Sequence, residues 1–75
     1  MNFRVVRTME PRTLHVVADT DGVYTVVAEL LWRFNNWNLF HVESDFGLTY
    51  TQRDEMNVFA NKQIVLMNIT ERLTK

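Results

Sequence analysis

A stripe of apolar residues at helical spacing runs through residues 22–35 and limits what this chain can build. The stripe follows the i, i+3, i+4, i+7 pattern of a helix with one buried face: Val23, Val26, Val27, Leu30 and Phe34. Asp19 and Asp21 precede it and suit a helix N-terminus, and Asn35 suits a C-terminus. Valine is a poor helix former, so such a helix must pack on another element. The sequence therefore predicts one main helix from about Gly22 to Asn35.

Segments rich in β-branched residues predict strands on both sides of this helix. Phe3 to Met9 and Thr13 to Ala18 alternate between apolar and polar residues, and the turn Glu10-Pro11-Arg12 joins them into a hairpin. Three later strands are expected: Leu39 to Ser44, Leu48 to Thr51 after an Asp45-Phe46-Gly47 turn, and Ile64 to Thr70. The segment Arg53 to Lys62 fits a helix, a loop or an edge strand. The expected order is β-β-α-β-β-(α)-β.

These elements define an α+β fold. The main helix must bury its apolar stripe on one face of an antiparallel sheet of four to five strands, which gives a small two-layer domain. The 75 residues are expected to form this single domain, 1–75, because the chain is shorter than most domains. The chain has no cysteine, which excludes disulfides and thiolate zinc sites.

No segment of the sequence predicts secretion or a membrane partner. The longest apolar runs, such as Ile64-Val65-Leu66-Met67, have four residues, whereas a membrane span needs about 18. The N-terminus lacks the apolar stretch and the small-residue cleavage site of a signal peptide. We therefore expect a cytoplasmic protein that does not bind membranes.

One short motif has the form of a catalytic site. The segment Leu14-His15-Val16-Val17-Ala18-Asp19-Thr20-Asp21-Gly22-Val23 places Asp-x-Asp-Gly after an apolar strand. It resembles the first motif of the haloacid-dehalogenase-type phosphatases, which implies a nucleophile at Asp19 and a general acid/base at Asp21. That family also needs a large parallel sheet and further distal residues, which 75 residues do not supply. The two histidines lack metal-binding spacing, so we expect no catalytic residue, cofactor or metal site.

The charge pattern favours a protein partner. The net charge is −1, whereas duplex-binding domains are usually strongly basic. Residues 19–55 are acidic and both ends of the chain are basic, which suits a larger protein with a basic surface. Trp32 would lie on the polar face of the predicted helix, and tryptophan is enriched in binding hot spots. The predicted docking surface consists of Trp32, Glu29, Tyr24, Asp19, Asp21 and Trp37.

The sequence thus predicts a small non-enzymatic protein-binding module, an inhibitor or regulator of a larger protein. Antitoxins and virus-encoded proteins share this size class, and a homodimer through the same surface is left open. The alternative is an RNA- or single-strand-binding protein that uses the arginines of the first hairpin, Arg4, Arg7 and Arg12.

Overall fold

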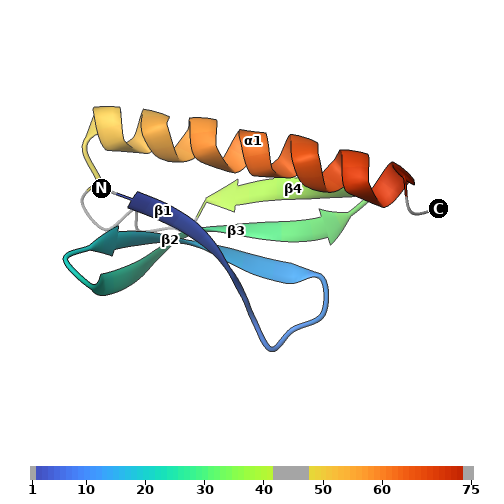
Figure 1. Ribbon diagram of the computed structural model, residues 1–75, viewed down its shortest axis with the longest axis horizontal. Coiled ribbons are helices and arrows are strands. Elements are labelled where there is room, and N and C mark those ends of the chain that lie inside the picture. The colour runs from blue at the N-terminus through green and yellow to red at the C-terminus, as the bar shows by residue number, and fades with distance from the viewer. Residues whose placement is uncertain (1, 42–47, 74–75) are drawn as a thin grey trace.

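A four-stranded antiparallel sheet and one long C-terminal helix make up the fold (Figure 1). The computed structural model describes residues 2–41 and 48–73. The strands are β1 (Asn2–Arg7), β2 (Thr13–Thr20), β3 (Val23–Arg33) and β4 (Asn36–His41), and they pair in the order β1-β2-β3-β4. The helix α1 (Tyr50–Leu73) runs along one face of the sheet. The predicted α+β class, one main helix on a four-stranded antiparallel sheet, is confirmed.

The predicted helix over residues 22–35 is wrong, because this segment forms β3. Asp21 and Gly22 have φ of 52° and 83° and make a two-residue turn, in which Asp19 Oδ1 accepts the Gly22 N–H at 3.1 Å. Asp-Gly between apolar segments is a strong hairpin signal, and the β-branched residues after it favour a strand. The Asp-x-Asp-Gly motif is therefore part of a hairpin and does not begin a helix.

A β-bulge explains why the apolar residues of β3 imitate a helix. Val16 pairs with Ala28 and Val17 pairs with Val26, so Val27 is an extra residue opposite β2. Val27 and Ala28 are both buried, although consecutive residues of a regular strand point to opposite faces. With Leu30 also buried, the apolar spacing becomes irregular and matches the helical pattern by coincidence.

The last predicted strand is also wrong, because residues 64–70 lie within α1. The ambiguous segment 53–62 is helical, and the strand predicted from Leu48 is absent since α1 begins at Tyr50. Thr49 Oγ1 accepts the Gln52 N–H at 3.1 Å, and Gln52 Oε1 accepts the Thr49 N–H at 3.0 Å. This reciprocal pair is a capping box, which fixes the start of the helix. The predicted turn at residues 45–47 lies outside the described residues.

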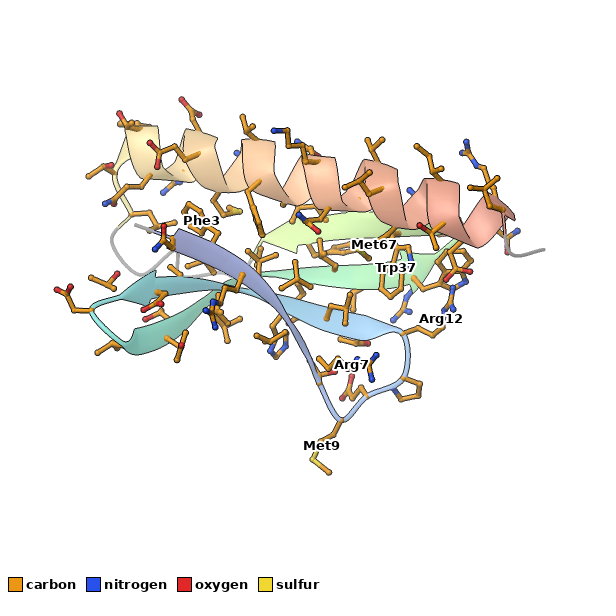
Figure 2. All side chains as sticks on the ribbon, viewed as in Figure 1. Phe3, Arg7, Met9, Arg12, Trp37 and Met67 are labelled. Carbon is orange, nitrogen blue, oxygen red and sulfur yellow. The ribbon has the colours of Figure 1, made fainter. Side chains whose placement is uncertain are left out.

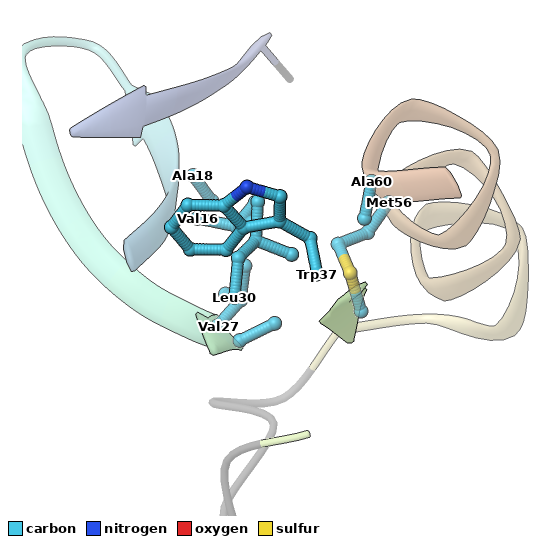
Figure 3. Close-up of a cluster of buried hydrophobic side chains, with 8 residues drawn as sticks. Val16, Ala18, Val27, Leu30, Trp37, Met56 and Ala60 are labelled. Atoms are coloured by element: carbon cyan, nitrogen blue, oxygen red, sulfur yellow. The ribbon is translucent and has the colours of Figure 1, made fainter. Parts of the chain in front are cut away.

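A single hydrophobic core joins the sheet to α1 (Figure 3). Val16 and Ala28 are paired across β2 and β3 and are fully buried, as is Leu30. From α1, Met56 and Ala60 are buried against them. The small side chain of Ala60 allows the helix backbone to approach the sheet closely. The core therefore depends on one face of α1 and one face of the sheet.

Phe34 is strained at the β3–β4 turn, and its replacement by asparagine is expected to stabilise the protein. Phe34 and Asn35 have φ of 57° and 63°, and the Phe34 side chain is 92% exposed. Asparagine tolerates a positive φ better, so Phe34→Asn should add about 0.5–1 kcal/mol and raise Tm by about 2–8 °C. Thermal denaturation measures this. Met9→Asn, also at an exposed loop residue, is the control; a lower Tm for Phe34→Asn alone would contradict the strain.

Candidate functional site

The predicted docking residues fall into two groups at opposite ends of β3. Tyr24 pairs with Asp19 next to the β2–β3 turn, which contains Asp21. Trp32 pairs with Trp37 next to the β3–β4 turn. Eight residues of strand separate the groups by about 26 Å, because a strand rises about 3.3 Å per residue. The six residues therefore do not form one continuous surface.

Glu29 lies apart from both groups. Its neighbours Ala28 and Leu30 are fully buried on the helix side, so Glu29 points to the other face of the sheet. There it lies between His15 of β2 and Phe40 of β4. Glu29 therefore contributes to the face of the sheet that α1 does not cover.

The two tryptophans belong to a packed cluster between the sheet and α1. Figure 2 shows Trp37 and Arg12 of this cluster near the C-terminal end of α1. Their ring centroids lie 5.8 Å apart at 72°, and Trp37 is only 9% exposed. The Arg12 guanidinium carbon lies 4.0 Å from the Trp32 ring centroid, and Arg12 Nη2 lies 3.1 Å from Glu71 Oε1. The Trp37 N–H donates to Asn68 Oδ1 at 2.8 Å. This cluster ties the first hairpin and β4 to α1.

The first group forms an acidic end of the molecule. Asp19 and Asp21 line a hollow of about 460 Å³ between the β2–β3 turn and the start of α1, together with Asn2, Thr20, Gly22 and Gln52. Tyr24 is exposed beside Asp19, and the Arg4 guanidinium carbon lies 5.9 Å from its ring centroid. We call Asp19, Asp21 and Tyr24 the acidic surface. It combines negative charge with one exposed aromatic ring.

The structure brings together only two of the three arginines that the sequence predicts to bind nucleic acid. Arg7 and Arg12 line a hollow of about 420 Å³ beside Trp37, at the end of the molecule opposite the acidic surface (Figure 2). Arg4 lies elsewhere, because it pairs with Val17 whereas Arg7 pairs with Leu14, and these positions are on opposite faces of the sheet. The three arginines therefore do not line one surface.

A further apolar surface lies on α1 and was not expected from the sequence, because the pattern of residues 64–70 predicts a strand. On the side of α1 away from the sheet, Val58 is 61% exposed and Leu73 is 80% exposed. They belong to an exposed apolar stripe at helical spacing, which we call the α1 outer face: Val58, Val65, Leu66, Ile69 and Leu73. Met56 and Ala60 mark the opposite, buried side. The signal was present as two apolar stripes with a period of about 3.6 residues.

The described part of the chain carries neither a metal-binding cluster nor a membrane-spanning helix. Residues 2–41 and 48–73 hold no group of three or more His, Asp or Glu side chains that would bind a metal ion. Within those same residues, no helix has the length and apolar character needed to span a bilayer. Comparison with protein families, with curated proteins and with solved structures finds no match to this chain.

Proposed function

We propose that this protein is a non-enzymatic protein-binding module, an inhibitor or regulator that covers part of a larger cytoplasmic protein. The acidic surface carries the proposal. Asp19 and Asp21 line a hollow beside the exposed ring of Tyr24, at the end of the molecule away from the arginine-lined hollow. Tyrosine is enriched in binding hot spots, and carboxylates at the rim of a contact set its orientation.

The partner is expected to present a basic surface. A lysine or arginine side chain of the partner would enter the hollow between the β2–β3 turn and α1, where it meets Asp19 and Asp21. An apolar part of the partner would cover the Tyr24 ring. Exposed charges steer the encounter, so association should be faster at low ionic strength.

Reversal of one charge tests this proposal. Asp21→Lys should reduce the amount of partner captured from a lysate of the native host about tenfold or more, because a like charge would face the basic partner. Asn35→Lys is the matched control, since both residues are exposed, lie in a two-residue turn and have a positive φ. Equal capture by both variants and the wild type would refute the role of the acidic surface.

Nucleic-acid binding is the second candidate function. It is favoured by the hollow that Arg7 and Arg12 share beside Trp37. Arg12 already contacts Glu71 and the Trp32 ring, so a phosphate would compete with these contacts. Binding of this kind would weaken steeply as the salt concentration rises.

A further inference from the structure

The α1 outer face is an apolar surface that no described element covers. One side of α1 is buried on the sheet, whereas Val58, Val65 and Ile69 are exposed along the opposite side. A single helix that packs on one sheet needs only one apolar side. Rows of exposed apolar side chains of this kind mark contacts with another protein.

One pair of opposite charges on α1 fits an antiparallel second copy. Arg53, Asp54 and Glu55 lie near the start of the helix, and Glu71 and Arg72 lie near its end. Glu55 and Arg72 are equally far along the chain from the midpoint between Gln63 and Ile64. In an antiparallel pair of helices with a two-fold axis at this midpoint, Glu55 of each copy faces Arg72 of the other.

One apolar pair of the α1 outer face fits the same symmetry. Val58 and Ile69 lie at equal distances on either side of that midpoint, whereas Val65 falls opposite Lys62 of the second copy. Beside Val58 is a hollow of about 430 Å³ lined by Thr51, Asp54, Glu55, Val58, Phe59 and Lys62. In the antiparallel pair, the exposed Ile69 and Leu73 of the second copy approach this hollow. One charged pair, one apolar pair and the position of the hollow are therefore compatible with this arrangement.

The charges at the two ends of the molecule also differ. The start of α1 lies beside the acidic surface, since Gln52 lines the same hollow as Asp21. The other end of α1 lies beside the hollow lined by Arg7, Arg12 and Glu10, since Arg12 contacts Glu71. An antiparallel pair therefore places Asp19 and Asp21 of each copy toward the end that carries Arg7 and Arg72 of the other, which favours a second copy over an unrelated partner.

We infer that the α1 outer face is the interface of an antiparallel homodimer, in which Val58 packs near Ile69 of the second copy and Glu55 pairs with Arg72 of the second copy. This inference goes beyond the proposed function, because Asp19, Asp21 and Tyr24 lie outside the interface. A dimer would present two acidic surfaces to a partner. It would also cover apolar surface that a small domain otherwise leaves in water.

The mass of the full chain in solution tests the interface. Analytical ultracentrifugation over a range of protein concentrations should give twice the chain mass of 8.9 kDa for the wild type. Val58→Asp places a charge opposite Ile69 of the second copy and should give a folded monomer, with unchanged circular dichroism. Val23→Asp is the matched control, because Val23 is also an exposed valine but lies on β3. A monomeric wild type, or a Val58→Asp variant that remains dimeric, would overturn the inference.

Charge exchange tests the antiparallel register. Glu55→Arg and Arg72→Glu should each weaken the dimer about fivefold or more, because two symmetric ion pairs are lost in each case. The double variant should restore the wild-type dissociation constant, and a failure to restore it would overturn the register. Capture of a partner through Asp21 is measured separately on the Val58→Asp variant. If no dimer is found, the proposed function is still tested by partner capture through Asp21. If no partner is captured, the dimer is still tested by the mass in solution.

Discussion

Ala60→Asp is expected to remove a large part of the protein's stability. Ala60 is 0% exposed and lies where α1 contacts the sheet, so its replacement would bury an unpaired carboxylate. The expected cost is about 3–5 kcal/mol. A chain of this length has a total stability of about 4–11 kcal/mol. The variant should therefore lose a large part of its stability and, at the lower end of this range, unfold, as measured by urea denaturation and far-UV circular dichroism.

Asn61→Asp is the control for this prediction. Asn61 is the next residue of α1 and is exposed, so its change should alter the free energy of unfolding by about 0.5 kcal/mol or less. Equal stability of the two variants would show that residue 60 does not face the sheet. That result would contradict the packing of α1 described above.

Trp37→Ala is expected to destabilise the protein by about 3–5 kcal/mol, the usual cost of truncating a buried tryptophan. Trp37 packs against Trp32 at a ring centroid distance of 5.8 Å and belongs to the buried core. Phe40→Ala, on the same strand but exposed, should cost about 1 kcal/mol or less. Urea denaturation of the two variants measures both values.

The same experiment separates a packing role of Trp37 from the docking role that the sequence predicts. A docking residue can be truncated with little loss of stability and a large loss of partner binding. If Trp37→Ala is as stable as the wild type and no longer captures the partner, Trp37 is a docking residue. The burial of Trp37 leads us to expect the opposite result.

The first hairpin and the fold class could be predicted from the sequence, and the helix could not be placed. Alternation and one proline were sufficient for β1, β2 and the turn at residues 10–12. The bulge at Val27 disturbed the alternation in β3, so that a strand acquired helical spacing. The dipeptide Asp21-Gly22 was a better guide to this segment than the apolar spacing, because Asp-Gly is typical of a hairpin turn between two strands.

The helix α1 was not predicted from the sequence, because it is apolar on two sides. Where the inner and outer stripes meet, Ile64 to Met67 form a continuous apolar run that resembles a buried strand. The capping box of Thr49 and Gln52 was readable in the sequence and marks the true start of the helix. Its position could have shown that the residues after Thr49 form a helix.

Only those residues of the candidate site that lie around one hairpin turn were predicted to be neighbours correctly. Asp19, Asp21 and Tyr24 lie close together because one tight turn brings them together. Trp32 was expected beside them, because a helix rises only about 1.5 Å per residue. In the strand the same residues are far apart, and Trp32 meets Trp37 instead.

Affinity capture from a lysate of the native host, with and without nuclease, tests most directly whether this protein binds another protein. The tagged wild type and the Asp21→Lys variant are compared in the same lysate. The proposed function predicts a stoichiometric protein partner that survives nuclease and is lost from the Asp21→Lys variant. Recovery of nucleic acid that disappears with nuclease and is unaffected by Asp21→Lys would contradict it, and would favour the hollow lined by Arg7 and Arg12.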